Sequence, residues 1–317
     1  MMEVECAAES SLDHPVVENF IGRGYHVFDG GVDPAAASAL LAKIRALRTF
    51  DADLFLSEAE FDANPQYTGV NPAPGRNLLE RFEDDLAFVE KDEAIVSAVS
   101  ALLGGDYEIL LKKLICGVPA SVVPDWLKAR IAGNPVNNLG AYVKAPFRDI
   151  TYFYGIDFHQ DLIDYKDREA DFITLYVYLH DVGPHDAPLF LLEDSHKLGG
   201  TLFPHDLTKN ATRDGQVGWL YRDGRGHEIQ TRQHLLTGKT GYAAMWHACT
   251  LHGTQPDAAD NERLSLRYLL ARRPGAAAPG MDAVNATLQG PLSLEATRQD
   301  LDARGKAQIK ANSVNKA

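Results

Sequence analysis

The stretch that decides the fold is Tyr154-Gly155-Ile156-Asp157-Phe158-His159-Gln160-Asp161, which ends in an H-x-D triplet. On a strand, residues i and i+2 point to the same face, so the imidazole of His159 and the carboxylate of Asp161 are expected to converge on one point. Among the eleven histidines, only His159 has an aspartate two residues further on. The triplet alone is a weak sign of a metal site, because such short patterns are frequent by chance.

A second pattern near the C-terminal end strengthens the metal hypothesis. His252 lies in Leu251-His252-Gly253-Thr254, and Arg263 and Ser265 follow it with the spacing H-x10-R-x-S. No other histidine of the chain has an arginine at that offset. The two patterns together supply two histidines, one carboxylate and one separate cation.

These residue types suit a particular chemistry. Two histidines and one carboxylate form a facial triad, which leaves three positions open on a ferrous ion. A 2-oxo acid can take two of them and dioxygen the third, and the far carboxylate of 2-oxoglutarate then needs a cation. Arg263 and Ser265, two residues apart on a predicted strand, share a face and can hold that carboxylate.

The surrounding chain predicts a mainly β protein with flanking helices. Residues 1–105 are mostly helical, with Asp33 and Pro34 as a helix start and apolar spacing continuing through 78–89 and 92–102. Short strands without long helices between them follow over 106–275 and favour a jelly roll. The predicted strands are 107–115, 141–144, 172–179, 188–192, 241–246 and 263–271.

Two further segments complete a single predicted domain over residues 1–317. Residues 204–239 interrupt the strands with six basic and four acidic side chains, and we interpret them as a lid-like insertion over the surface. Residues 276–317 form a C-terminal extension, in which 292–310 is predicted to be an exposed helix.

With these residues in place, the chain resembles the phytanoyl-CoA dioxygenase-like (PhyH-type) branch of the Fe(II)/2-oxoglutarate-dependent oxygenases. The resemblance includes Gly24-Tyr25-His26-Val27 near the start and Val143-Lys144-Ala145-Pro146 before the metal triplet. A turn that reads Pro-Gly-Ser-His in the family reads Glu193-Asp194-Ser195-His196 here, and a glycine usual before the preceding strand is replaced by Ala187-Pro188. Both departures fall in turns.

The resemblance implies a double-stranded β-helix (jelly roll, cupin-like) with the metal at its open end. It implies that His159, Asp161 and His252 bind Fe(II), and that Arg263 and Ser265 bind 2-oxoglutarate. Thr254, Tyr142 and Thr174 are implied as further neighbours of the cosubstrate. The implied reaction uses dioxygen, with ascorbate as a possible reductant, and releases succinate and CO2 while a small-molecule substrate, amino-acid-like or a natural product, is hydroxylated.

The composition of the chain excludes some classes of binding partner and favours one cellular compartment. The net charge of −13 argues against nucleic acid and against an anionic membrane surface. Three scattered cysteines, no apolar segment of membrane-spanning length and an acidic N-terminus favour a cytoplasmic protein. Signatures of zinc peptidases, serine hydrolases, P-loop NTPases and Rossmann enzymes are absent from the sequence.

Two other functions remain open at this point. One is a non-catalytic jelly-roll binding module, and the other is a cupin-type dioxygenase that does not use 2-oxoglutarate. Among rival ligands, His247 precedes His252 by five residues, but a core role suits it better because it lacks the arginine. Surface or turn positions are expected for the remaining cluster of His180, His185, His196 and His205.

Overall fold

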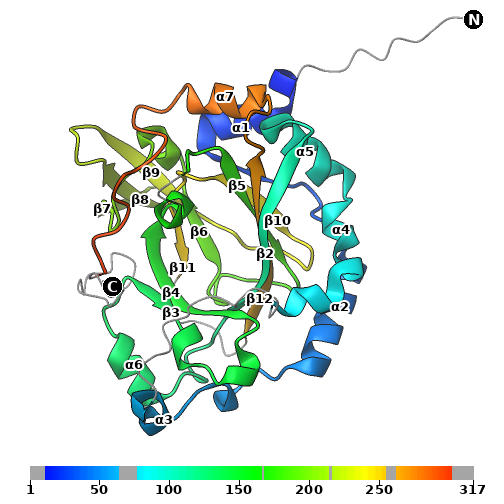
Figure 1. The fold of residues 1–317 in the computed structure, drawn as a ribbon. Coiled ribbons are helices and arrows are strands. Elements are labelled where there is room, and N and C mark those ends of the chain that lie inside the picture. Colours follow the sequence, from blue (N-terminus) through cyan, green and yellow to red (C-terminus); the bar gives the residue numbers. More distant parts are fainter. Residues whose placement is uncertain (1–10, 64–76, 166–167, 214–215, 255–261, 302–317) are drawn as a thin grey trace, which may run out of the picture.

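Two layers of β-strands face each other, and helices cover the outer side of one layer (Figure 1). The computed structural model describes residues 11–63, 77–165, 168–213, 216–254 and 262–301. Hydrogen-bonded neighbours follow the order β1-β10-β5-β12-β2-β4-β11-β6-β9-β8-β7, with β3 beside β4. The predicted jelly roll with a helical N-terminal part is confirmed.

The first layer lies under the helices, and its strands pair antiparallel. Every residue of two central strands is buried, because one face packs on the helices and the other faces the second layer. The five strands are β1 (Tyr25–Val27), β10 (Ala243–His247), β5 (Phe172–Tyr178), β12 (Arg263–Arg272) and β2 (Tyr107–Gly117).

The second layer closes the barrel. It contains β3 (Val136–Asn138), β4 (Thr151–His159), β11 (His252–Thr254), β6 (Leu189–Leu192) and β9 (Glu228–Leu235). The layers are joined where β2 and β4 run parallel. Apolar side chains of both layers, such as Trp246 of β10 and Leu191 of β6, fill the space between them.

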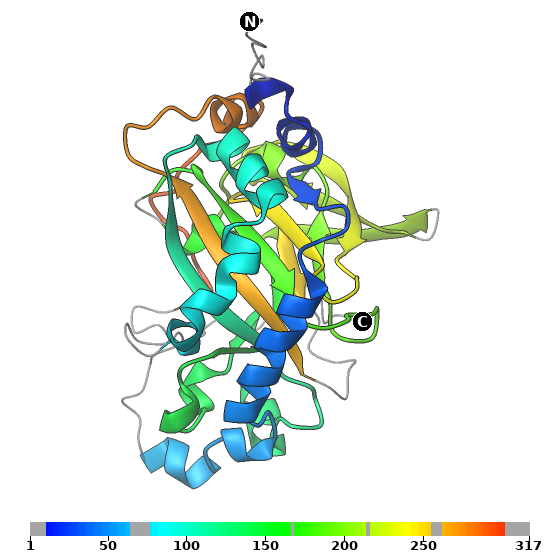
Figure 2. The ribbon, with the colours of Figure 1, turned by 90° about the vertical axis from the view of Figure 1, so that its right-hand side faces the viewer.

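The helices cover the outer face of the first layer. Figure 2 shows α2 and α5 lying across it. Leu40 and Ile44 of α2 pack in one cluster with Val99 of α5 and outward side chains of β12. The α-helices are α1 (Pro15–Arg23), α2 (Pro34–Leu47), α3 (Glu58–Ala63), α4 (Ala87–Glu90), α5 (Glu93–Leu103), α6 (Asp125–Ile131) and α7 (Pro279–Asn285). No described helix has both the length and the apolar character needed to cross a membrane.

Two sequence predictions of secondary structure are wrong. The predicted strand 141–144 overlaps a 3₁₀-helix, Gly140–Tyr142, because Asn138 Oδ1 accepts a hydrogen bond from Gly140 N and closes a local turn. The predicted helix 292–310 is not helical over 292–301, where the backbone instead bonds to Ala170 and pairs at Phe203. Residues 302–310 lie outside the described part of the chain, as does Cys6.

The segment 204–239, predicted as a lid-like insertion, is largely regular sheet. β7 (Asp206–Arg213) pairs with β8 (Gln216–Arg222), and β8 pairs with β9. Because β9 also pairs with β6, these strands extend the second layer beyond β6. Two of its arginines have partners. Arg222 pairs with Glu228, and Arg225 donates to the carbonyls of Leu198 and Gly200.

The start of α2 offers a test of the helical part. Asp33 Oδ1 accepts hydrogen bonds from the amides of Ala35 and Ala36, 2.8 and 3.2 Å away, as the sequence predicts for an N-cap. We expect Asp33→Ala to lower the free energy of unfolding by about 1 kcal/mol, because both amides lose their acceptor. Chemical denaturation measures this, with the exposed Asp84→Ala as control. Equal stability of both variants would contradict the role of the cap.

Candidate metal centre

The two histidines meet because their strands are neighbours. β4 ends at His159 and β11 begins at His252, and these residues are paired directly across the antiparallel ladder. Their ring centroids are 4.1 Å apart. Nδ1 of His159 lies 3.0 Å from the carbonyl oxygen of Asp157, and Nδ1 of His252 lies 3.0 Å from that of Thr250. Each Nδ1–H donates to its carbonyl, which leaves Nε2 as the ligand atom.

Asp161 reaches the same point from a different element. The strand stops at His159, and Asp161 begins the 3₁₀-helix Asp161–Asp164, so the expectation that a strand carries the whole triplet is wrong. One ligand atom from each of the three residues lies within 4.8 Å of the others. Ligand atoms about 2.1 Å from one ion are roughly 3–4 Å apart, so small side-chain rotations suffice to bind a metal.

The two carboxylate oxygens of Asp161 have different surroundings. Oδ2 accepts hydrogen bonds from Thr174 Oγ1 at 2.5 Å and from Trp246 Nε1 at 3.1 Å. Oδ1 lies 3.6 Å from His252 Nε2 and contacts Nη2 of Arg267. Oδ1 is therefore the oxygen that faces the metal position, and Oδ2 fixes the orientation of the carboxylate.

Gln160, the middle residue of the triplet, holds the turn between the ligands. Its side chain is fully buried, and Nε2 donates to the carbonyl oxygens of Gly199 and Cys249, both at 2.8 Å. Its Oε1 accepts from Thr201 N at 3.0 Å. Gln160 thus connects the triplet to the segment that precedes His252.

The charges of the site suit a cation. Burial raises the pKa of Asp161, but Arg267 and the two histidines outweigh burial, so the pKa lies well below its usual range. Burial lowers the pKa of His159, and burial together with His159 lowers the pKa of His252 to about 3. At neutral pH the site therefore offers two neutral imidazoles and one carboxylate, the protonation state that a metal requires.

The predicted cosubstrate cation is deeply buried at the start of β12. Arg263 is 2% exposed, and within the described chain its Nε and Nη1 have no hydrogen-bond partner, nor has Ser265 Oγ. A side chain at Gly117, the paired residue on β2, would place its Cβ 3.2 Å from Arg263 Nε, so glycine leaves room for the guanidinium. Buried charges are stable only when paired. A carboxylate such as that of 2-oxoglutarate fits this position.

The three remaining predicted neighbours of the cosubstrate lie in different places. Thr174 bonds to the metal-site carboxylate, so it orients Asp161. Thr254 donates to the carbonyl of Ala187. Tyr142 packs on Phe61 and Trp126, with ring centroids 4.7 and 6.1 Å away, in a cluster on the helical side. The contact of Thr254 with Ala187 and the contacts of Tyr142 with Phe61 and Trp126 do not support a role in binding the cosubstrate.

Other histidines divide into core and site residues. His247 is buried and bonds to Asn285, as expected for a core residue. Surface or turn positions were predicted for His196 and His205: both are buried rather than on the surface, and His196 lies in the turn that follows β6. Burial and the nearby His159 and His252 lower the pKa of His205 to about 3, and no described residue bonds to its Nε2.

Several neighbours of the metal position are not recognisable from the sequence alone. Trp246, Lys113 and His205 carry no motif, since strands distant in sequence bring them together. The alternation of residues on β12 was the available signal for Arg267, which shares a face with Arg263 and Ser265.

The turn Glu193-Asp194-Ser195-His196 supports the second histidine. Ser195 Oγ donates to Leu192 O at 2.7 Å and accepts from Leu251 N at 2.8 Å, so the turn holds the residue just before His252. Asp194 has φ 62° and Ala187 has φ 47°, both in the left-handed region. These are the places where the family resemblance led us to expect glycine.

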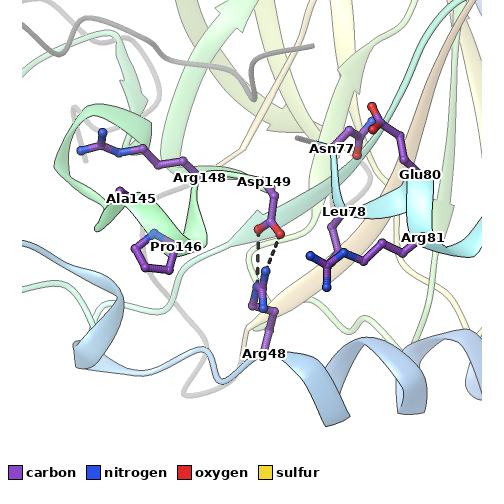
Figure 3. Close-up of a pocket in the computed structure, with 9 residues that line it drawn as sticks. All are labelled: Arg48, Asn77, Leu78, Glu80, Arg81, Ala145, Pro146, Arg148 and Asp149. Carbon is purple, nitrogen blue, oxygen red and sulfur yellow. Dashed lines mark hydrogen bonds and ion pairs between the residues drawn. The ribbon is translucent and has the colours of Figure 1, made fainter. Parts of the chain in front are cut away.

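A separate surface pocket lies between α2 and the start of β4 (Figure 3). Its lining includes Arg48, which pairs with Asp149, together with Arg81 and Arg148. None of the metal-site residues lines it. The pocket is therefore distinct from the metal centre.

A jelly roll that holds two histidines and one carboxylate in the same interior as a buried arginine, whose Nε and Nη1 have no partner among the described residues, has the arrangement of a mononuclear non-haem iron centre. The chain belongs to the phytanoyl-CoA dioxygenase (PhyH) family, whose sequence profile matches residues 20–265. The family resemblance drawn from the sequence is thus confirmed.

Individual relatives are distant. Over 116 residues, 36% of this chain, the sequence is 28% identical to a probable alpha-ketoglutarate-dependent hypophosphite dioxygenase of Stutzerimonas stutzeri, and the match spans 38% of that protein's length. Similar solved structures include EctD from S. alaskensis, at 14% identity, TM-score 0.47 and coverage of 93% of this chain and 90% of that one. Another is the carbocyclase SnoK from nogalamycin biosynthesis, at 12% identity, TM-score 0.48 and coverage of 83% and 86%.

Gln160 provides a test of how the site is built. We expect Gln160→Ala to lower the free energy of unfolding by about 2–4 kcal/mol, because buried backbone groups of Gly199, Cys249 and Thr201 lose their partners. Ferrous binding should weaken as well, since the triplet loses its anchor. Urea denaturation and anaerobic Fe(II) titration measure both effects. The exposed Gln230→Ala is the control, and wild-type stability of Gln160→Ala would reject the anchoring role.

Proposed function

We propose that the protein is an Fe(II)- and 2-oxoglutarate-dependent oxygenase that oxidises a small molecule, most simply by hydroxylation. One observation carries the proposal: the His159, Asp161 and His252 ligand set lies in the same interior as Arg263, a buried guanidinium with unpartnered nitrogen atoms. The overall reaction converts substrate, 2-oxoglutarate and dioxygen into hydroxylated substrate, succinate and CO2.

Each residue has a defined task in this proposal. Iron, when bound, supplies the redox chemistry that couples decarboxylation of 2-oxoglutarate to oxidation of the substrate. Nε2 of each histidine and Oδ1 of Asp161 hold the ion, while Thr174 and Trp246 keep the carboxylate aligned through Oδ2. Arg263 and Ser265 bind the far carboxylate of 2-oxoglutarate and thereby orient its keto acid end toward the metal.

The structure favours this proposal over the two alternatives. A non-catalytic binding module has no need for two histidines whose Nδ1 atoms are both held by backbone carbonyls. A cupin-type dioxygenase without 2-oxoglutarate has no carboxylate for the buried Arg263 to bind, and no reason to keep the space that Gly117 leaves beside the guanidinium. Ferrous-dependent release of succinate distinguishes the proposed enzyme from both.

A cytoplasmic location and the lid role of residues 204–239 belong to the same proposal. The described cysteines, Cys116 and Cys249, are free and buried, which suits a reducing compartment.

The extension formed by β7 and β8 packs Trp219 and Tyr221 against Phe158 of β4, next to His159 in the chain. Phe158 points to the face of β4 opposite to His159, so this contact braces the strand that carries the ligand. His205, at the start of the segment 204–239, is buried close to His159 and His252, and its position supports a role of the segment in shielding the site.

The metal assignment is tested by removing one ligand at a time. We expect His159→Ala and His252→Ala each to abolish succinate release and to weaken Fe(II) binding, because a site with three protein ligands has no spare one. Fe(II) titration and succinate assays measure the effects, with the core variant His247→Ala as a matched control. Full turnover in either ligand variant would refute the assignment.

The cosubstrate assignment is tested at Arg263. We expect Arg263→Ala to raise the KM for 2-oxoglutarate at least tenfold while Fe(II) binding persists, because a buried charge-assisted pair contributes about 2–3 kcal/mol. Arg273→Ala, an exposed arginine just after β12, serves as control. An unchanged dependence on 2-oxoglutarate would mean that another cation holds the cosubstrate.

A further inference from the structure

A histidine side chain takes the place of a backbone acceptor where β12 leaves β5. The ladder between these strands ends at the pair Ser265 and Tyr178. One residue further along, Leu264 O accepts a hydrogen bond from Leu179 N at 3.2 Å. In an antiparallel pair of this kind, the amide of Leu264 would donate to the carbonyl oxygen of Leu179 in return. It donates instead to Nε2 of His180, 2.9 Å away.

The hydrogen bonds of His180 define its tautomer. Nε2 is an acceptor, because the amide of Leu264 can only donate, so the ring proton is on Nδ1. Nδ1 lies 2.9 Å from the carbonyl oxygen of Asp181 and donates to it. Leu264 is fully buried, so water cannot replace the imidazole as acceptor unless the chain moves.

The residue next to this hydrogen bond is the predicted cosubstrate cation. Arg263 is the first residue of β12, and it is paired with Gly117 of β2 at the other edge of the strand. Its guanidinium occupies space that a side chain at Gly117 would fill. A displacement of the first residues of β12 would therefore move the guanidinium away from the place that the fold leaves for it.

His180 is itself part of a well-bonded segment. The carboxylate of Asp181, the next residue, accepts hydrogen bonds from the amide and the hydroxyl of Thr240, at 2.8 and 3.1 Å. Val182 and Gly238 then exchange two backbone hydrogen bonds. The imidazole therefore holds the start of β12 from a fixed position.

A second contact near the start of β12 is a weaker constraint. Glu262 accepts hydrogen bonds from Nε and Nη2 of Arg45 on α2, at 3.0 and 2.5 Å. The side chain of Arg45 is 48% exposed, and exposed ion pairs contribute little to stability. The buried amide of Leu264 is therefore the group whose partner matters most for the backbone beside Arg263.

We propose that His180 is a positioning residue for the cosubstrate: it fixes the start of β12 so that the Arg263 guanidinium meets the far carboxylate of 2-oxoglutarate. This inference rests on the proposed function and deepens it. A ligand-binding side chain keeps its affinity only while the residues around it hold it in place. Without the imidazole, the unpaired amide of Leu264 can find a partner only if β12 moves at that point.

The metal ligands should not respond in the same way. His159 and His252 lie on β4 and β11, and Asp161 lies on the 3₁₀-helix after β4, so the start of β12 carries none of them. The effect of losing the imidazole should therefore fall on the affinity for 2-oxoglutarate and leave the affinity for Fe(II) unchanged.

Two substitutions that differ by one methylene group test the acceptor. His180→Gln places its amide oxygen close to the position of Nε2, whereas the shorter His180→Asn reaches only the position of Nδ1. We expect His180→Ala and His180→Asn to raise the dissociation constant of 2-oxoglutarate for the anaerobic Fe(II) protein by about fivefold or more. His180→Gln should stay within about twofold of the wild type. Direct Fe(II) titration should give the same affinity in all three variants.

Hydrogen exchange of the metal-free protein reports on the bond itself. The amide of Leu264 should exchange about tenfold faster in His180→Ala and His180→Asn than in the wild type, and His180→Gln should restore slow exchange. The exposed His185→Ala, in the loop that follows, is the matched control. Thermal melts of all variants report correct folding.

Three results would overturn the proposal. One is a 2-oxoglutarate affinity of His180→Ala equal to that of the wild type, even if the amide of Leu264 exchanges faster. Another is a His180→Gln variant that binds 2-oxoglutarate as weakly as His180→Ala. The third is a loss of Fe(II) affinity as large as the loss of 2-oxoglutarate affinity, because the effect would then be general to the fold.

Failure of the proposed function gives a different pattern. Wild-type protein that binds no 2-oxoglutarate, or an Arg263→Ala variant that binds it as tightly as the wild type, would reject the cosubstrate role of Arg263 and with it the inference. The exchange rate of Leu264 would still respond to His180 in that case. Normal behaviour of the wild type and of Arg263→Ala, with no effect at His180, would reject the inference alone.

Discussion

The burial of one carboxylate, that of Asp161, is the constraint on which the rest of the site depends. A charge that is 2% exposed is stable only with polar partners on every side. Thr174 of β5, Trp246 of β10 and Arg267 of β12 supply them from three neighbouring strands of the first layer. The ligand itself comes from the second layer. The carboxylate therefore fixes the two layers relative to each other at the metal position.

Much of this metal centre could be predicted from the sequence, because its ligands and the cosubstrate arginine lie in two short stretches of the chain. The triplet is three consecutive residues where β4 ends, and the H-x10-R-x-S pattern lies within a short stretch of the chain, from His252 to Ser265. The helix start at Asp33 and the long strands β2, β5 and β12 were also predictable, since their signals are local. These features need no knowledge of which strands become neighbours.

The rest could not be read from the chain because it depends on contacts between distant segments. Trp246 and Lys113 look like ordinary strand residues until β10 and β2 are placed around Asp161. Asp161 itself leaves the strand because Gln160 is held by backbone groups some 40 and 90 residues away, at Gly199 and Cys249. Tyr142 is a different case, because the turn that contains it is local and depends on the hydrogen bond that Gly140 N donates to Asn138 Oδ1.

At Ala187 and Asp194 the fold keeps a left-handed backbone conformation although neither residue is glycine. An L-residue in that region costs about 1 kcal/mol more than glycine, yet the chain keeps the conformation at both positions. The loop geometry must therefore be imposed from outside, by β6 and by the hydrogen bond that Leu251 N donates to Ser195 Oγ. Evolution can then change the residue type at these corners without moving the second histidine, so a search that requires glycine there would overlook members of the family such as this chain.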